Sequence, residues 1–308
     1  MDVVVSVLII TYNQSLFVEQ AIRSVLAQKT DFTFEILIGD DGSTDGTRAI
    51  LEKFKDIPNV RLFLRESNIG ASRNLQALRR AASGRYFAYL EGDDYWLDED
   101  KLQKQVDFLN AHSEYVACTS RALFVDKDGC KMPRQRLTWI VNKKVFTLKD
   151  FKGVYLPGQI GTLVHRNLSA EGMEEVECIH PMIADRSVFF FLLSKGNIYQ
   201  MSERFCAYRV MKSQSITAML YWNNPNRVLD DYRLTKKLEK YAVSHGLRCS
   251  FAAHKRHLFV SAFWAYLRKR SASNREVMVA ISHDGCPLLY WLYLPFGILR
   301  KIYYKLVA

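Results

Sequence analysis

The sequence predicts an α/β protein with a mostly parallel sheet flanked by helices and a helical extension at its C-terminal end. Short apolar runs, rich in β-branched and aromatic residues, alternate with stretches of helical periodicity over the first hundred residues. Two of these runs end in clusters of acids. The chain has 308 residues, 49% of them apolar, so it can bury a large core in one domain or in two.

Four apolar runs in the first half are predicted strands, and they cover residues 3–10, 34–38, 60–64 and 86–90. Apolar residues at helical spacing separate them, first at Val18, Ala21, Ile22, Val25 and Leu26 and then at Ile50, Leu51 and Phe54. Strands that alternate with helices predict parallel pairing, because a parallel connection needs a crossover. A helix containing Leu102, Val106 and Leu109 and a strand near residues 116–119 complete this half.

The second half is less regular. Residues 123–155 are mixed and basic, with a turn at Lys127, Asp128 and Gly129, and we expect a β-rich excursion with mobile loops there. Residues 187–193 predict a helix, residues 205–210 a strand, and the chain beyond Trp222 further helices. We therefore expect three parts: an α/β half over residues 1–120, a second half over 121–215, and a basic, aromatic, helical extension over 216–308.

Positive charge is concentrated at the C-terminal end. The formal net charge is +11, and residues 232–308 hold 14 Lys or Arg against three acids, whereas the first 231 residues hold 29 of each sign. A neutral body with a basic tail favours docking to an anionic surface and argues against a nucleic-acid partner, whose cleft should itself be positive. The six cysteines show neither a zinc spacing nor a compact disulfide pattern, and the first residues lack a signal-peptide leader, which together favour a cytoplasmic location.

Two acidic clusters follow predicted strands, one at residues 40–43 and one at 91–94. Ligands of open α/β sheets bind beyond the carboxyl ends of the strands, so acids placed there are expected to line a cleft. One or two carboxylates together with substrate phosphates commonly hold Mg²⁺ or Mn²⁺. The pattern therefore predicts a metal-assisted enzyme acting on a phosphate ester.

Each cluster also has a simpler interpretation. Asp40 and Asp41 could form turns while Ser43 or Thr44 caps the next helix. The second cluster could be a solvated loop before a helix that starts near Asp98, although the acids at 98–100 already supply charge for that helix dipole.

Four segments carry these motifs: SVLIITYN at residues 6–13, IGDDGSTDGT at 38–47, NIGASRN at 68–74 and EGDDYW at 91–96. In this order and spacing they resemble the inverting glycosyltransferases of family 2 over roughly the first two thirds of the chain. The resemblance implies a GT-A (Rossmann-like) fold, a nucleotide-sugar donor, expected to be a UDP-sugar, and Mg²⁺ or Mn²⁺. It makes residues 1–120 the nucleotide-sugar-binding half and residues 121–215 the half that binds the acceptor and supplies the catalytic base.

The resemblance also implies roles for single residues around the donor. It places Thr11, Tyr12, Asn13 and Asp41 around the nucleoside, with Asp41 preferred to Asp40. Asp93 matches the last acid of the family's D-x-D pattern and, with the neighbouring Asp94, is expected to bind the metal. Glu91 stands where an Asp is more usual, and we expect it to contact the ribose through a longer side chain.

The catalytic base implied by the resemblance is Asp185, which precedes the predicted helix some ninety residues beyond the metal cluster. A carboxylate there would take the proton of the attacking acceptor hydroxyl, and the alternative from the residues alone is an ordinary helix N-cap. The segment at 208–212 looks like the family's Y-R-x-H, with Met211 in place of the His, so Arg209 and Lys212 are expected to neutralise the diphosphate. Arg73 is a second candidate for that contact.

The apolar segment at residues 287–299 is too short to span a bilayer comfortably and is followed by Arg300 and Lys301. Trp, Tyr and flanking cations favour attachment to the cytoplasmic face of a membrane, which would suit a lipid-linked saccharide acceptor in the synthesis of a surface polysaccharide. The alternative is a terminal helix that packs on the body or on a partner subunit of an oligomer.

Two other functions fit parts of the sequence. A nucleotidyltransferase would keep the fold, but it usually opens with a Gly-rich basic loop that residues 11–14 do not provide. Glu91 and Met211 are departures from the family pattern that would suit a non-catalytic, membrane-associated scaffold with nucleotide affinity.

Overall fold

The computed structural model describes residues 2–133, 137, 139–168, 172–173, 175, 185–211, 226–269, 272–284, 294–295 and 297. The chain forms two compact units. The first comprises Met1–Phe151 and Tyr155–Met211, and the second comprises Lys152–Val154 and Lys212–Ala308. Each unit is described by itself.

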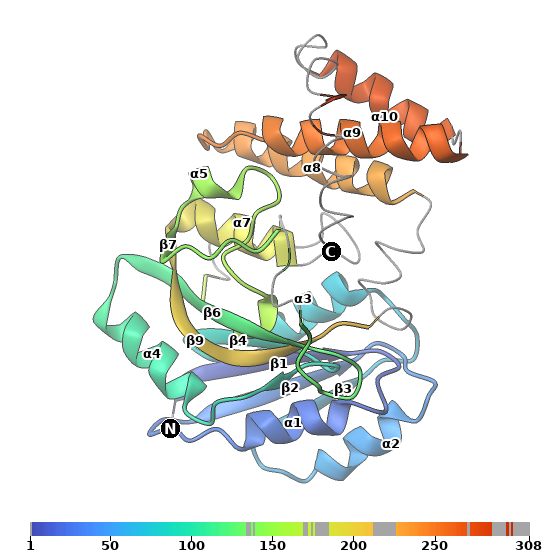
Figure 1. Cartoon of the computed structure of the whole chain (residues 1–308). Coiled ribbons are helices and arrows are strands. Elements are labelled where there is room, and N and C mark those ends of the chain that lie inside the picture. Colours follow the sequence, from blue (N-terminus) through green and yellow to red (C-terminus); the bar gives the residue numbers. More distant parts are fainter. Residues whose placement is uncertain are drawn as a thin grey trace. The chain divides into compact units, whose positions relative to one another are not determined.

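The first unit is built on one mixed sheet, which has nine strands within the described part of the chain (Figure 1). The strands are β1 (Val5–Thr11), β2 (Phe34–Asp40), β3 (Val60–Leu64), β4 (Tyr86–Glu91), β5 (Tyr95–Trp96), β6 (Tyr115–Val125), β7 (Val145–Phe146), β8 (Val164–Arg166) and β9 (Asn197–Arg209). Their order is β3-β2-β1-β4-β8-β6-β9-β5, and β7 pairs with β9.

The predicted parallel sheet is confirmed for the four strands of the first half. Strands β3, β2, β1 and β4 are parallel neighbours, with Thr11 beside Asp40 and Ile10 beside Glu91. Because these strands share one direction, their carboxyl ends lie at one edge of the sheet. The sequence motifs after β1, β2, β3 and β4 are thereby brought to that edge.

Helices cover both faces of this parallel part. These are α1 (Val18–Leu26), α2 (Thr47–Leu51), the 3₁₀ turn η1 (Glu52–Phe54), α3 (Ala71–Ala81) and α4 (Lys101–Ala111). The main core lies between the sheet and the apolar sides of α1, α2 and α4, where Ile9, Ile22, Leu90, Trp96 and Val106 are buried. Helix α3 packs against β1 and β2 (Figure 1).

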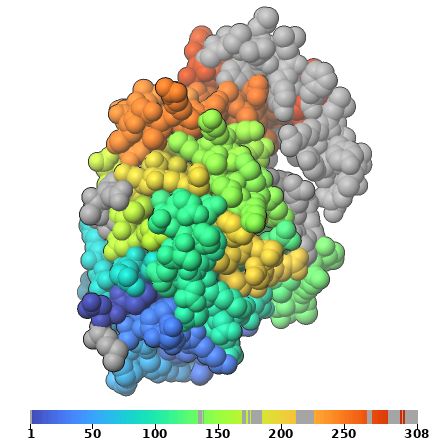
Figure 2. Space-filling model, turned by 90° about the vertical axis from the view of Figure 1, so that its left-hand side faces the viewer, coloured from blue at the N-terminus to red at the C-terminus, as the bar shows by residue number. Residues whose placement is uncertain are grey.

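Strands β6 and β9 are much longer than the sequence predicts. They have 11 and 13 residues and pair in parallel, with register shifts at Arg121, an exposed residue. The alternation of apolar and polar residues is interrupted at these shifts, which hides the full length of both strands from a periodicity argument. Figure 2 shows the surface from the left-hand side of Figure 1, where α4 and the curved strand β9 lie.

The expected β-rich excursion over residues 123–155 is confirmed only in part, because its described residues include the end of β6 and isolated β-bridges at Lys131 and Ile140. The structure has a turn in which Gly129 N donates to Asp126 O, the two-residue strand β7, and the short helix α5 (Leu148–Phe151). The turn itself is where the sequence predicts it. Beyond this region lie the 3₁₀ turn η2 (Ile160–Thr162), strand β8 and helix α7 (Asp185–Lys195).

The second unit contains three described helices, α8 (Arg227–Ser244), α9 (Ala252–Lys269) and α10 (Ala272–His283), as the sequence predicts. They pack around a small core that includes Leu229, Phe259, Val277 and Ile281. Lys255, with a side chain 7% exposed, pairs with Glu239 of α8 at 2.6 Å and, at 3.0 Å, with Asp284, the residue that follows α10. No helix among the described residues is both long and apolar enough to cross a bilayer. The predicted membrane-binding segment at 287–299 lies almost wholly outside the described residues.

Candidate active site

The loop after β1 is fastened to the loop after β2. The backbone N–H of Asn13 donates to Ser43 Oγ at 2.9 Å, and Asn13 Oδ1 accepts from Thr44 N at 2.8 Å. Asn13 adopts a left-handed φ of 52°, a conformation that Asn tolerates better than most residues. Tyr12 is left 39% exposed beside this junction. The alternative that Ser43 or Thr44 caps the next helix is wrong, because α2 begins at Thr47 after a left-handed Gly46.

The first acidic pair is satisfied within the protein. Asp40 is buried, accepts from Ser43 N at 3.1 Å and pairs with Arg48 Nε at 2.8 Å. Asp41 accepts from the backbone N–H groups of Ile69 and Gly70, both at 2.9 Å, and so fixes the segment that leads into α3. These contacts hold both carboxylates within the loop, and the contact of Asp41 with a nucleoside stays a prediction.

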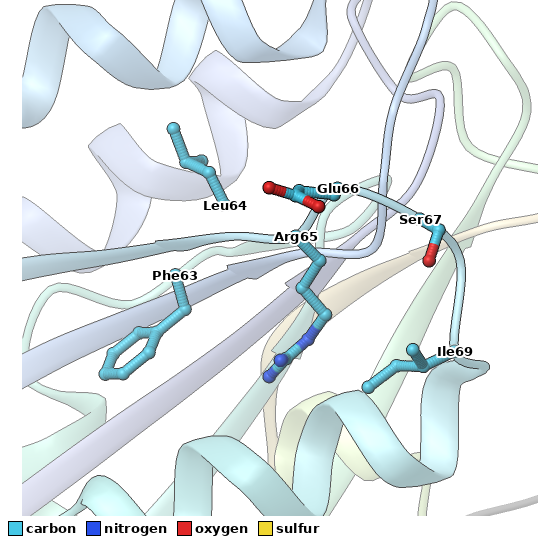
Figure 3. A pocket seen from close by; sticks show the side chains of 6 residues that line it. All are labelled: Phe63, Leu64, Arg65, Glu66, Ser67 and Ile69. Atoms are coloured by element: carbon cyan, nitrogen blue, oxygen red, sulfur yellow. The ribbon is translucent and has the colours of Figure 1, made fainter.

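A shallow hollow opens beside this segment, at the carboxyl end of β3 (Figure 3). It is lined by Phe63, Leu64, Arg65, Glu66, Ser67 and Ile69. Arg65 Nε donates to Asn74 Oδ1 at 3.0 Å, which holds the guanidinium against α3. Arg73 lies in the first turn of α3 and is exposed.

The second acidic cluster is pressed against the end of β1 through Gly92. Its backbone N–H donates to Ile10 O at 2.9 Å. A Cβ at this position would lie 2.5 Å from Gln14 Oε1 and 2.8 Å from Thr11 Oγ1, so only glycine permits so close an approach. Both of those oxygens are buried and have no hydrogen-bond partner. The sequence assigned Thr11 to the donor, and its unsatisfied hydroxyl is available to a ligand at this edge of the sheet.

The carboxylates of the second cluster lie in a site with too little positive charge. Burial, followed by the charges of Asp93 and Asp185, raises the pKa of Glu91 to about 8. Burial raises the pKa of Asp93 to about 6, even though Arg209 and a hydrogen bond from Gln14 act in the opposite direction. Burial and the charges of Asp93 and Glu91 hold the pKa of Asp94 well above its usual range. Like charges so close together favour protonation or a bound cation.

A divalent cation fits this donor set. Carboxylate oxygens are the ligands that Mg²⁺ and Mn²⁺ prefer, and a cation would relieve the repulsion between them. Across the described ranges, however, no group of three or more His, Cys, Asp or Glu side chains is arranged to hold a metal by itself. An ion bound by Asp93 and Asp94 would therefore need further oxygens from a ligand, as in sites that use substrate phosphates.

Arg209 holds the acidic loop in place. Its backbone N–H donates to Asp94 Oδ1 at 2.8 Å and its Nε donates to Asp93 O at 2.9 Å. The rest of the guanidinium contacts Lys127 O at 2.7 Å and Gln20 Oε1 at 2.9 Å, over the ring of Phe17. The side chain that the sequence assigned to the diphosphate is thus engaged with the protein, and its contact with phosphate stays a prediction.

Two predicted features of the site follow Arg209 in the sequence, at positions 211 and 212. Met211, which stands where the family often has His, is buried. Lys212, the other predicted diphosphate partner, lies outside the described residues.

Gln159 is a site residue that the sequence analysis missed. It precedes η2, and its Nε2 donates to Asp94 Oδ2 at 3.0 Å and to Glu91 Oε2 at 3.3 Å. Gln159 follows the segment with the weakest periodicity, and nothing in the local sequence marks it as close to acids 65 and 68 positions earlier.

Asp185, the predicted base, is the first residue of α7 and is half-buried. Its charge contributes to the raised pKa of Glu91, so the two carboxylates are close enough to repel each other. Burial raises the pKa of Asp185 itself, although the backbone N–H of Arg186, which donates to Asp185 Oδ1 at 2.7 Å, opposes that shift. These features agree with the predicted base, whose role stays a prediction.

His165 lies in β8, beside Phe87 of β4. It is buried, its Nε2 lies 2.6 Å from Tyr89 Oη, and burial lowers its pKa to about 3, so the ring is neutral. His180 lies outside the described residues.

Residues 6–170 match the family model described as "Glycosyl transferase family 2". The chain belongs to that family. The matched residues contain β1 from Ser6 onward, both acidic clusters, Gln159 and β8. The match confirms the family that the sequence motifs indicated.

Three similar proteins illustrate the relationship. The putative teichuronic acid biosynthesis glycosyltransferase TuaG of Bacillus subtilis is 32% identical over 68% of this chain and 80% of its own length. The Escherichia coli UDP-Glc:alpha-D-GlcNAc-diphosphoundecaprenol beta-1,3-glucosyltransferase WfaP is 32% identical over 40% of this chain and 47% of its own. An uncharacterized protein of Mycobacterium tuberculosis, Rv1520, is 40% identical over 41% of this chain, and the match spans only 37% of that relative.

Solved structures confirm the predicted fold. Staphylococcus aureus TarS in complex with UDP-GlcNAc superimposes with a TM-score of 0.64, at 17% identity over 91% of this chain and 80% of the TarS chain. The mannosyltransferase PcManGT of Pyrobaculum calidifontis, in complex with GDP-Man and Mn²⁺, gives a TM-score of 0.51 at 16% identity over 97% of this chain and 80% of its own. The α/β sheet with flanking helices and C-terminal helices is therefore the GT-A fold.

Proposed function

We propose that the protein is a metal-dependent inverting glycosyltransferase that uses a nucleotide sugar, expected to be a UDP-sugar. The acceptor is a hydroxyl of a saccharide or of a lipid-linked saccharide, and the reaction serves the synthesis of a surface polysaccharide. TuaG and WfaP, whose names refer to teichuronic acid and to a diphosphoundecaprenol acceptor, support this setting.

One observation carries the proposal: Glu91, Asp93 and Asp94 converge at the carboxyl ends of the parallel strands with raised pKa values. Holding three carboxylates so close costs stability unless a cation is bound. A pyrophosphate that approached these acids without a cation would be repelled. The arrangement thus fits a ligand that arrives as a complex of a diphosphate and a divalent ion.

The donor would lie across the loops after β1, β2 and β3. In this proposal Thr11, Tyr12, Asn13 and Asp41 surround the nucleoside. The exposed ring of Tyr12 offers a stacking face, and the unsatisfied Thr11 Oγ1 offers a polar contact. Glu91 contacts the ribose, Asp93 also contacts the donor, and Arg73, Arg209 and Lys212 lie on the phosphate side.

The chemistry is divided between two groups of acids. Asp93 and Asp94 would hold Mg²⁺ or Mn²⁺, which when bound stabilises the negative charge on the departing nucleoside diphosphate. Asp185 accepts the proton of the acceptor hydroxyl as the oxygen attacks the anomeric carbon. Because that oxygen attacks from the side opposite the leaving group, the configuration at this carbon inverts.

The remaining parts of the chain would serve the acceptor. In this proposal residues 1–120 bind the nucleotide sugar, residues 121–215 bind the acceptor, and residues 216–308 attach the enzyme to the cytoplasmic face of the cell membrane. The excess of basic residues after position 231 supports an anionic membrane partner, and an oligomer formed through the tail is an alternative use of the same segment.

The test is a screen of the purified full chain against a panel of nucleotide sugars with Mn²⁺, Mg²⁺ or EDTA. Release of the nucleoside diphosphate is the readout, and the anomeric configuration of any product is read by proton NMR. We expect one donor to be consumed only in the presence of the metal. Failure of every donor to release diphosphate with a panel of saccharide and lipid-linked acceptors would contradict the proposal.

A further inference from the structure

The side-chain amide of Gln159 joins two carboxylates of the acidic cluster. Gln159 is 7% exposed, and its Oε1 accepts from Gly161 N at 2.6 Å. A backbone N–H can only donate, so this contact fixes which end of the amide is oxygen. The nitrogen Nε2 must then face Asp94 Oδ2 and Glu91 Oε2, at 3.0 and 3.3 Å.

Both hydrogens of the Gln159 amide nitrogen have an acceptor. An amide nitrogen has two hydrogens, and here each has a carboxylate within reach, one at the end of β4 and one in the loop that follows. Asp94 is also held from its other side, because Oδ1 accepts from Arg209 N at 2.8 Å. Two donors from distant segments therefore determine how the Asp94 carboxylate is turned.

A neutral donor suits this position better than a cation would. Lys or Arg beside Glu91 and Asp94 would neutralise the charge that attracts a divalent ion. An amide orients the carboxylates through hydrogen bonds and leaves their charge unchanged. Partners that orient the ligands of a metal without binding it have this role in many metal sites.

We propose that Gln159 is a positioning residue of the transfer reaction, whose amide holds Glu91 and Asp94 in the arrangement that receives the cation and the donor diphosphate. The inference rests on the function proposed above and adds to it a residue outside the family motifs. It also explains how the longer Glu91 is accommodated at a position where the family usually has Asp, since the extra methylene brings Oε2 within reach of the amide.

The competing explanation is that Gln159 only caps η2 through Gly161. The substitution Gln159→Glu separates the two roles, because it keeps the size and the acceptor for Gly161 N but replaces both donor hydrogens with a carboxylate oxygen. This variant also adds a negative charge beside the acids, so the uncharged Gln159→Met variant below is needed to tell a lost hydrogen bond from added repulsion. If Gln159 positions the carboxylates, kcat falls by about 10–100-fold while the KM for the donor changes far less.

Gln159→Met removes both functions of the side chain and needs a matched control. Gln105→Met is suitable, because Gln105 is buried and its Nε2 donates to Thr162 O at 3.0 Å, at the other end of η2. Both Met variants loosen the same turn, but only Gln159 contacts the acids. Each variant is measured for kcat and KM, for Mn²⁺ affinity by calorimetry without donor, and for melting temperature.

We expect Gln159→Met to weaken Mn²⁺ binding and transfer by about tenfold or more, with Gln105→Met close to wild type in both. The inference is overturned if Gln159→Glu keeps wild-type kcat, or if the two Met variants lose transfer and Mn²⁺ affinity equally.

A wild-type protein that neither transfers nor binds Mn²⁺ would refute the proposed function instead. In that case the melting temperature tests whether Gln159 orients the carboxylates. Gln159→Glu should lower it clearly in the wild type and much less when Glu91→Gln and Asp94→Asn remove the opposing charges. An equal drop in both backgrounds overturns the inference.

Discussion

Two acidic clusters follow β2 and β4, the two strands that flank β1 in the sheet, yet they differ in how their charge is satisfied. Asp40 is paired with Arg48, and Asp41 receives two backbone N–H groups. In the second cluster, burial raises the pKa values of all three acids, and the charges of neighbouring acids raise those of Glu91 and Asp94 further. A similar sequence pattern thus shapes a loop in one case and, in the other, creates a site that favours an external cation.

This comparison explains why acids at turns are weak evidence by themselves. A carboxylate that already accepts several hydrogen bonds contributes to folding, whereas one that raises the pKa of its neighbours costs stability and suggests a function. Asp185 belongs with the second cluster, because its charge also raises the pKa of Glu91.

The largest expected effect comes from Asp185→Asn. Loss of the base should reduce transfer by about 10²–10⁴-fold while UDP binding remains, because the amide keeps the shape but cannot take a proton. The measurement is initial rate together with UDP affinity by calorimetry. Asp150→Asn is the matched control, since Asp150 is another acid in the first turn of a helix of this unit. Transfer at the wild-type rate by Asp185→Asn would remove the base assignment.

Asp93→Asn should have a somewhat smaller effect on transfer, about 100-fold, because other oxygens can still reach the ion. The effect of this substitution on stability tests whether the second acidic cluster differs from the first. Removal of one repelling charge should raise the melting temperature of the metal-free protein and reduce the additional stabilisation by Mn²⁺. A lower melting temperature in EDTA would show that Asp93 is satisfied within the protein, as Asp40 is.

The stability of the metal-free protein should depend on pH in an unusual direction. The pKa values of Asp93, about 6, and of Glu91, about 8, exceed those of unfolded chains, so the folded state binds more protons between about pH 4 and pH 8. Stability from these groups is therefore complete below about pH 4 and is lost as the pH rises to 8.

Melting temperature measured against pH in EDTA and in Mn²⁺ tests this expectation. The difference between the two curves should grow with pH, because the ion binds the deprotonated acids. Two parallel curves would mean that Mn²⁺ does not bind at these carboxylates.

The smallest expected effect is that of Asp40→Asn. It weakens the pair with Arg48 and the contact with Ser43 N, and should cost about 1–3 kcal/mol in the free energy of unfolding. Mn²⁺ affinity should stay within about twofold of wild type, since Asp40 belongs to the first cluster, whose carboxylates bond to groups of the protein. Urea unfolding and calorimetry measure the two quantities. A strong loss of Mn²⁺ affinity would erase the distinction between the clusters.

The sequence alone determined the parallel half of the sheet and the position of both acidic clusters. Strands appear in the sequence as short apolar runs, and helices appear as apolar residues at helical spacing. Both patterns follow from local backbone geometry, so the sequence shows them directly. The carboxyl ends of parallel strands must meet at one edge, so the convergence of the motifs at residues 11–13, 40–41 and 91–94 followed from topology. The helices of the C-terminal extension also followed from periodicity.

Only the tertiary structure decided what each polar group contacts. Gln159 and Arg209 contact Asp94 from positions 65 and 115 residues later in the chain. Arg209 lies at the end of β9, which pairs with β6, and the register shifts between these two strands hide their length from the sequence pattern. The raised pKa values of Glu91 and Asp93 likewise depend on burial and on the distances between charges. Those quantities arise when distant segments pack together, and a linear pattern of residues does not contain them.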